Sequence, residues 1–149
     1  MRWLKFLLVL GFAAAFSARA ESAKIVKVLP QFLDAQGQHA LSPSLYARDA
    51  YQAQLRKNPK LRSGLRFEIQ WKASGYHDLK LRIEARGNHA SQPTQIMLEQ
   101  PAKKGGLFGN WTTIKLEGDA YKQFGELTSW RATLWAGDQQ VAEQKSFLW

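Results

Sequence analysis

Residues 65–72 read Leu65-Arg66-Phe67-Glu68-Ile69-Gln70-Trp71-Lys72, with apolar and polar side chains in strict alternation. Because successive side chains of a β-strand point to opposite faces, this stretch predicts a strand with one face toward a core and one toward water. The same alternation returns at residues 79–86, Leu-Lys-Leu-Arg-Ile-Glu-Ala-Arg. It dominates from residue 62 onward, so the chain is expected to be mostly β.

Five further segments carry strand patterns. They are residues 25–33, 94–99, 111–117, 130–136 and 140–149. Pro30 interrupts the first of these, which places that strand at a sheet edge or at a crossover between sheets, because proline cannot donate to a ladder. Each of about seven strands has one apolar stripe that only a second sheet can cover. The pattern therefore predicts an all-β, antiparallel, two-sheet sandwich.

Helical signals interrupt the series of strands twice. Ser42 followed by Pro43 predicts a helix N-cap with proline at the first helical position. Asn58-Pro59 ends that run. One side of this short helix is expected to carry Pro43, Ala47, Ala50, Tyr51, Gln54 and Leu55. The second signal is residues 118–125, Gly-Asp-Ala-Tyr-Lys-Gln-Phe-Gly, which predict a single helical turn before the Trp130 strand.

In length, strand count and the tyrosine-bearing turn before the Trp130 strand, residues 62–149 resemble an immunoglobulin-like or fibronectin-III-like domain. The resemblance is to the fold alone. The chain has no cysteine, so the Cys-Trp-Cys signature of true immunoglobulin domains is missing. Since many unrelated activities occur on this architecture, the resemblance implies no particular function.

Two arrangements of residues 65–71 and 79–85 remain open. As a hairpin, the strands could place Lys72 opposite Asp78, Glu68 opposite Arg82 and Arg66 opposite Glu84, and opposite charges in such positions each contribute about 0.2–1 kcal/mol. The immunoglobulin topology instead puts these two strands in different sheets. Strand order is therefore undecided at this point.

The first twenty residues have the pattern of a signal peptide. Arg2 and Lys5 precede an apolar run over residues 6–16, and Ala18-Arg19-Ala20 supplies the small residues of a cleavage site. The run is too short to cross a bilayer core of about 30 Å, and no later segment is apolar enough to span one. We therefore expect cleavage after Ala20, a single domain over residues 21–149 with no transmembrane anchor, and a periplasmic or extracellular location.

The sequence has 149 residues, with 21 Lys and Arg against 12 Asp and Glu. The leader holds three of the basic residues and no acidic one, which leaves 18 against 12. The excess lies between Arg48 and Arg86. A candidate basic patch spans the helix end and the next strand, and it consists of Arg56, Lys57, Lys60, Arg62 and Arg66. Export excludes intracellular nucleic acid, so this patch would contact acidic glycans, lipid headgroups or extracellular DNA, or would only complement the helix dipole.

Aromatic residues suggest a different binding site. On the Trp130 strand, alternation turns Trp135 outward together with Arg131 and Thr133, and Trp111 shares parity with Thr113 and Lys115. The last strand ends Phe147-Leu148-Trp149, so one or two of these large side chains must point away from the core. Outward aromatic side chains can anchor a protein partner or stack on sugar rings, or they can form a small covered cluster. The candidate binding residues are Trp111, Trp135, Phe147 and Trp149.

Catalytic and metal-binding patterns find little support. His39, His77 and His89 are isolated and lack the spacing of metal ligands. The absence of cysteine excludes a disulfide scaffold, a thiolate zinc site and a thiol nucleophile. No nucleophile elbow, phosphate loop or dinucleotide fingerprint occurs. We expect no catalytic residue, metal or cofactor.

These observations lead to three ranked hypotheses. The first is a non-catalytic, exported β-sandwich that acts as an accessory or protein-interaction module of the cell envelope. The second is a carbohydrate-binding module that uses Trp111 and Trp135 as stacking platforms. The third is an enzyme, which would need a cleft with converging titratable groups.

Overall fold

The computed structural model describes residues 20–149. It contains seven strands, two α-helices and one short 3₁₀ helix. In chain order these are β1 (Ser22–Asp34), α1 (Leu45–Lys57), η1 (Pro59–Leu61), β2 (Arg62–Ser74), β3 (Leu79–His89), β4 (Gln92–Pro101), β5 (Asn110–Glu117), α2 (Gly118–Phe124), β6 (Glu126–Ala136) and β7 (Gln139–Lys145). The expected signal peptide lies outside the described residues apart from Ala20, so its cleavage stays a prediction.

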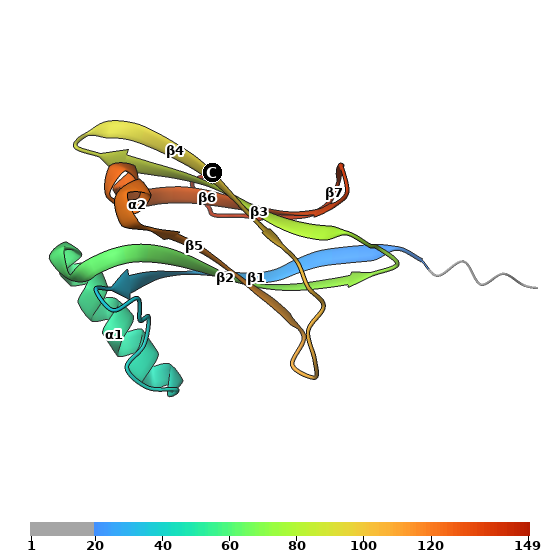
Figure 1. The fold of residues 1–149 in the computed structure, drawn as a ribbon, viewed down its shortest axis with the longest axis horizontal. Coiled ribbons are helices and arrows are strands. Elements are labelled where there is room, and N and C mark those ends of the chain that lie inside the picture. The colour runs from blue at the N-terminus through green and yellow to red at the C-terminus, as the bar shows by residue number, and fades with distance from the viewer. Residues whose placement is uncertain (1–19) are drawn as a thin grey trace, which may run out of the picture.

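The strands form two antiparallel sheets that face each other. One sheet has the order β1-β2-β5 and the other has the order β4-β3-β6-β7. Figure 1 shows the two layers, with α1 against the outer side of the three-stranded sheet at one end. The predicted mostly β, two-sheet sandwich with about seven strands is thus confirmed. Pro30 lies in β1, an edge strand, as its missing N–H requires.

The hairpin between residues 65–71 and 79–85 is wrong. These segments belong to β2 and β3, which lie in different sheets. Glu68 pairs with Arg66 of its own strand at 3.0 Å, whereas Arg82 pairs with Glu99 of β4 at 2.7 Å. Each outer face carries charges of both signs, so the charge match across the two strands did not require them to be neighbours.

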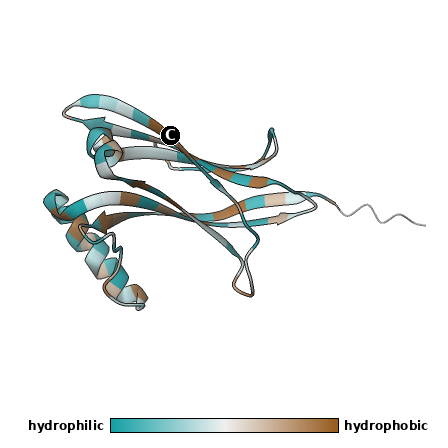
Figure 2. Ribbon diagram, viewed as in Figure 1, coloured by the Kyte–Doolittle hydropathy of each residue, from teal (hydrophilic) through white to brown (hydrophobic). Residues whose placement is uncertain are grey.

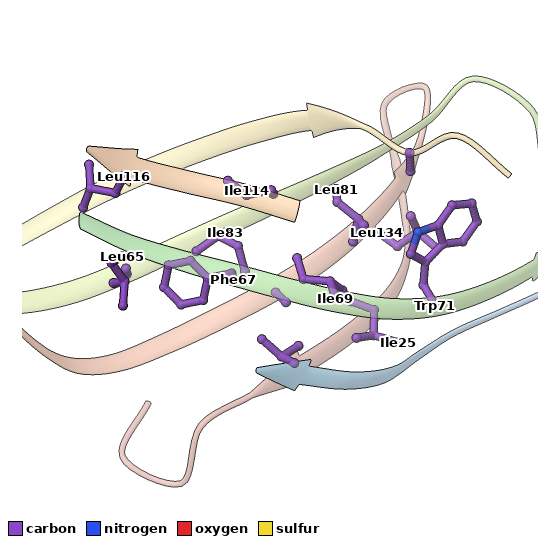
Figure 3. Packing of buried hydrophobic residues seen from close by; sticks show 14 of the residues in the cluster. Ile25, Leu65, Phe67, Ile69, Trp71, Leu81, Ile83, Ile114, Leu116 and Leu134 are labelled. Carbon is purple, nitrogen blue, oxygen red and sulfur yellow. The ribbon is translucent and has the colours of Figure 1, made fainter. Parts of the chain in front are cut away.

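The core lies between the sheets and is built from the apolar positions of the alternating strands. Figure 2 shows hydrophobic and hydrophilic residues alternating along the strands, and Figure 3 shows the inward side chains of both sheets packed together. Phe67 and Ile69 of β2 and Leu81 and Ile83 of β3 are fully buried. The one polar atom of Trp71 is also satisfied, since its Nε1 donates to Thr112 Oγ1 at 3.0 Å.

Helix α1 begins two residues later than predicted. Ser44, not Ser42, is the N-cap, and its hydroxyl accepts a hydrogen bond from Ala47 N at 3.4 Å. Ser42 Oγ lies in the preceding turn, where it accepts a hydrogen bond from Ser44 N. The predicted end is right, because Asn58 N and Nδ2 both donate to Gln54 O before Pro59.

The buried side of α1 is rotated from the predicted one. Gln52 and Leu55 are buried, whereas Gln54 and Ala50 face solvent. Gln52 Nε2 donates to Phe32 O at 2.9 Å and its Oε1 accepts from Phe32 N at 2.8 Å. At Phe32 the amide thus takes the place of a neighbouring strand on the free edge of β1.

Helix α2 confirms the predicted helical turn between residues 118 and 125 and closes one end of the core. Its Phe124 is buried, and Phe124 O accepts from Thr94 Oγ1 at 2.6 Å. Gly125, which follows with φ 77°, has no room for a side chain, since an added Cβ would lie 2.2 Å from Asn88 O.

β7 ends earlier than predicted, at Lys145. Over residues 20–149, neither α-helix has the length and apolar character that a bilayer-spanning segment needs.

Candidate functional site

The outer face of the four-stranded sheet carries a ladder of charged side chains from β3 and β6. In the β3–β6 register, Glu84 lies opposite Arg131, and Arg131 donates to Glu84 Oε2 at 2.7–2.8 Å from two nitrogens. On the other side of β3, Arg82 contacts Glu99 of β4 at 2.7 Å, and Lys80 lies 3.3 Å from the same carboxylate. The hydrogen bond from Arg82 is the main reason why the pKa of Glu99 lies below its usual value. The carboxylates therefore hold the arginines in defined positions.

Tryptophan rings lie against these arginines. The Cζ atom of Arg82 is 4.5 Å from the centroid of the Trp135 ring, and Trp135 Nε1 donates to Thr133 Oγ1 at 2.8 Å. Trp149 lies against two arginines, 3.9 Å from Arg86 Cζ and 5.0 Å from Arg131 Cζ. These are cation–π distances. We call the set Arg82, Arg86, Arg131, Trp135 and Trp149 the arginine–tryptophan face.

A short turn after β7 brings Trp149 onto this face. Ser146 anchors it, since Ser146 N donates to Trp130 O at 2.9 Å and Ser146 Oγ accepts from Trp130 N at 3.0 Å. Trp149 N then donates to Ser146 O. The same turn leaves Phe147 fully exposed and Leu148 largely exposed, within two residues of Trp149. The sequence signal for this surface was the aromatic pair at the end of the last strand.

Trp111 lies on the opposite side of the sandwich. It is 39% exposed on β5, in the three-stranded sheet. Thr112 and Ile114, which alternate with it along the strand, face the core. Trp111 and Trp135 therefore cannot form one flat platform. The nearest other exposed apolar side chains in sequence are Leu107 and Phe108, which the loop before β5 presents to solvent.

Two of the five basic-patch residues are committed to internal contacts. The Arg62 side chain is only 4% exposed, donates to the carbonyl oxygens of Leu55 and Arg56 at the end of α1, and contacts Glu126 of β6 at 2.6 Å. It also lies 4.0 Å from the Phe32 ring centroid. Arg62 is thus a clamp between the helix and both sheets.

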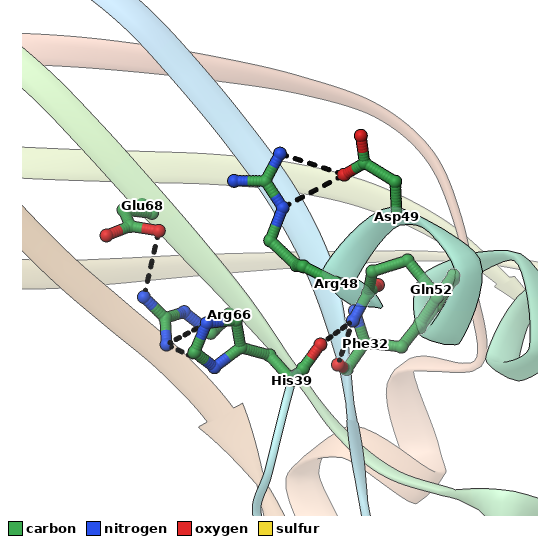
Figure 4. Close-up of polar contacts among 7 residues, drawn as sticks. All are labelled: Phe32, His39, Arg48, Asp49, Gln52, Arg66 and Glu68. Atoms are coloured by element: carbon green, nitrogen blue, oxygen red, sulfur yellow. Dashed lines mark hydrogen bonds and ion pairs between the residues drawn. The ribbon is translucent and has the colours of Figure 1, made fainter. Parts of the chain in front are cut away.

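The second committed residue is Arg66, which lies under the loop that leads to α1. Figure 4 shows it between His39 and Glu68, with Nη1 2.8 Å from His39 Nδ1 and Nη2 3.0 Å from Glu68 Oε2. Arg56, Lys57 and Lys60, in contrast, are exposed. Three cations rather than five are therefore presented to solvent by the predicted patch.

These surroundings favour the neutral form of His39. Burial lowers its pKa, and the Arg66 guanidinium lowers it further. Since arginine only donates, His39 Nδ1 must accept, which removes that nitrogen from the role of a general base. The depression beside it is lined by Leu41, Leu45, Arg48 and Glu68 among others, and it is open to solvent. The arrangement orders the loop that leads to α1.

Asp34 is a structural residue that the sequence reasoning missed. Burial alone would raise its pKa, but hydrogen bonds from Tyr51 and from the N–H groups of Gln36 and Gln38 outweigh burial and lower the pKa. The carboxylate thereby ties the loop after β1 to helix α1. An Asp followed at short range by turn residues is a signal for this kind of loop.

The isolated histidines do not meet other ligating side chains. His77 and His89 are exposed, and within residues 20–149 no group of three His, Asp or Glu side chains is arranged to hold a metal ion. Comparisons with protein-family models, with characterised proteins and with solved structures gave no match.

Proposed function

We propose that the chain is an exported, immunoglobulin-like or fibronectin-III-like sandwich that acts as a non-catalytic protein-interaction module in the periplasm or outside the cell. The topology supports this fold: β1 and β2 share one sheet, β3 and β4 lie in the other, β5 returns to pair with β2, and β6 and β7 complete the second sheet. The leader pattern supports export.

The arginine–tryptophan face next to exposed Phe147 carries the functional proposal. Tryptophan and arginine dominate the energetics of protein interfaces, and binding costs less entropy when their side chains are already held in place. Here carboxylates and rings hold Arg82 and Arg131, and Phe147 supplies an apolar anchor beside them. The fitting partner is a protein surface with acidic side chains around an apolar pocket.

Carbohydrate stacking is a weaker alternative for this surface. A sugar platform needs ring faces open to solvent, whereas guanidinium groups cover the rings of Trp135 and Trp149 on at least one side. Trp111, the second predicted platform residue, belongs to the other sheet. The geometry thus favours a polypeptide partner.

The test is capture from the envelope fraction of the source cells with the tagged chain from Glu21 onward. Two matched charge reversals are compared with the unaltered chain: Arg86→Glu on the arginine–tryptophan face and Lys57→Glu on the basic patch, both at exposed positions. We expect one polypeptide to be retained by the unaltered chain and by Lys57→Glu and to be lost with Arg86→Glu. Loss with Lys57→Glu alone would contradict the proposal, as would recovery of no polypeptide together with specific binding on a glycan array.

A further inference from the structure

One edge strand of the sandwich, β4, leaves backbone groups open to pairing with a further strand. β4 and β7 are the edge strands of the four-stranded sheet, and Figure 1 shows β4, the longer of the two, along the border of its layer. β1 and β5 are the edges of the other sheet, and Gln52 of α1 pairs with Phe32 on the edge of β1. β4 carries one charged residue, Glu99, which Arg82 and Lys80 already neutralise. Charged residues and prolines are the usual protection of an edge against pairing, and β4 has its two prolines only near its ends, with no unpaired charge between them.

One backbone hydrogen bond at the end of β4 fixes which of its backbone groups point outward. Ala102 N donates to Leu79 O at 2.8 Å, in line with the β3–β4 register. Since hydrogen-bonded pairs recur every second residue, Thr94, Ile96, Leu98 and Gln100 direct their backbone groups toward β3. The N–H and C=O groups of Gln95, Met97 and Glu99 therefore point away from the sheet.

The two prolines of β4 belong to this outward set. Pro93 and Pro101 have no N–H to offer, so each ends the run of usable donors. They stand at equal distances from Met97, four residues on either side. The outward donors and acceptors are thus arranged symmetrically about Met97.

We infer that two copies of the chain pair through β4, antiparallel, with the two-fold axis at Met97. In this register Gln95 pairs with Glu99 of the second copy, Met97 pairs with its own equivalent, and Pro93 lies opposite Pro101 of the second copy. The three complete pairs supply about six backbone hydrogen bonds. A shift of the register by two residues would set a proline against a residue that needs a donor and would leave two complete pairs.

Side chains agree with this register. The Glu99 carboxylate meets the neutral Gln95 amide of the second copy rather than another carboxylate, so like charges are not opposed. On the inner face Ile96 meets Leu98 of the second copy, and both side chains are half-buried in the single chain. A depression of about 360 Å³, lined by Ile96, Ala120 and Phe124 among others, lies beside the edge and gives these side chains room.

The two-fold pairing also makes the assembly finite. A two-fold pairing of one edge with its own copy is closed, because it consumes the edge in both partners. The pairing joins two four-stranded sheets into one, which places two arginine–tryptophan faces on a continuous surface. The dimer does not depend on the proposed partner, so either proposal can fail alone.

Cysteine cross-linking tests the register directly, because the chain has no cysteine of its own. In Met97→Cys the two cysteines would face each other at the two-fold axis. Their Cα atoms would then lie within the roughly 4.4–6.8 Å that a disulfide needs. In the control, Gln95→Cys, the two thiols would lie about 13 Å apart, four strand residues from each other. We expect Met97→Cys to form a disulfide-linked dimer under mild oxidation and Gln95→Cys to remain mostly single. Efficient linking of Gln95→Cys, or none of Met97→Cys, would overturn the register.

Sedimentation equilibrium of the chain from Glu21 tests the dimer itself. The unaltered chain should show a dimer mass that dissociates on dilution. Met97→Pro removes only an outward donor and should raise the dissociation constant by about tenfold or more, while Gln95→Lys, which faces Glu99 of the second copy, should lower it. Circular dichroism checks that each variant keeps its strands. A monomer mass at millimolar concentration, or a dimer that Met97→Pro leaves unchanged, would overturn the inference.

Discussion

The two outer faces of the sandwich use arginine in opposite ways. On the three-stranded sheet, Arg62 and Arg66 lie beneath α1 and the loop before it and bind carbonyl oxygens, a histidine and carboxylates. On the four-stranded sheet, Arg82 and Arg86 lie on tryptophan rings in contact with solvent. Residues of one type thus stabilise the fold on one face and are free to contact a partner on the other. What differs is the cover that α1 provides.

Helix α1 lies on the three-stranded sheet because it docks on the edge of β1. Gln52 matches both backbone groups of Phe32 on the free edge of β1, and its Nε2 also donates to His39 O at 2.8 Å. The helix is thereby fixed at β1 together with the loop that precedes it. The four-stranded sheet receives no such cover over residues 20–149, so its face stays open.

The largest expected effect is on the covered face, at Arg62. Arg62→Gln removes the contacts to the end of α1 and to Glu126, and a buried charge-assisted network of this kind contributes about 3 kcal/mol. Urea unfolding should show this loss in the free energy of unfolding. Arg86→Gln, on the open face, is the matched control and should cost less than about 1 kcal/mol. Equal losses would remove the distinction between the faces.

Gln52→Ala should have the next largest effect. It leaves the backbone groups of Phe32 without partners and loosens the loop at His39, so we expect a loss of about 2 kcal/mol in the free energy of unfolding. Gln54→Ala, two residues away on the exposed side of α1, should change stability by only a few tenths of a kcal/mol, roughly. A loss in Gln54→Ala as large as that in Gln52→Ala would contradict the docking described for α1.

The sequence predicted the sheets better than it predicted the helix. Strict alternation assigned Phe67, Ile69, Leu81 and Ile83 to the core. A shift of either strand by one residue would place its charged side chains in the core instead. The helix has no such constraint. Its apolar side is short, and the residue that docks it is a polar glutamine, which hydropathy assigns to solvent.

Candidate site residues were harder to predict for a related reason. A count of charges cannot distinguish Arg62, which is buried as a clamp, from Lys57, which is exposed. Parity did place Trp135 on an outer face, but parity within each strand does not say that Trp111 and Trp135 lie in different sheets. Strand order is a long-range property, and the misleading charge match between β2 and β3 shows how local patterns fail to determine it.

A smaller effect is expected from pH. Because the pKa of His39 is lower in the folded chain than its ordinary value of 6.5, the unfolded chain takes up the proton first as pH falls. The stability that neutral His39 contributes is present above pH 6.5 and is lost as pH falls through 6.5 toward the folded pKa. In His39→Gln, whose amide oxygen can still accept from Arg66, this part of the slope should disappear. An unchanged slope between neutral and mildly acidic pH would show that His39 does not cause it.

The smallest effect on stability is expected at Trp149. Its cation–π contacts with Arg86 and Arg131 lie at the surface, where such contacts contribute about 0.5–1 kcal/mol. Trp149→Ala should therefore unfold at nearly the same urea concentration as the unaltered chain while losing the captured polypeptide. A large loss of stability would mean that Trp149 belongs to the fold and not to a binding face.

Site-specific photo-cross-linking in intact cells compares the two faces directly. A photoreactive amino acid is placed at Phe147, beside the arginine–tryptophan face, or at Leu41, an exposed apolar position in the loop that covers the other face. If the open face is the interaction surface, irradiation yields a discrete adduct with one polypeptide from the Phe147 position and none from Leu41. The same adduct from Leu41, with none from Phe147, would contradict the account.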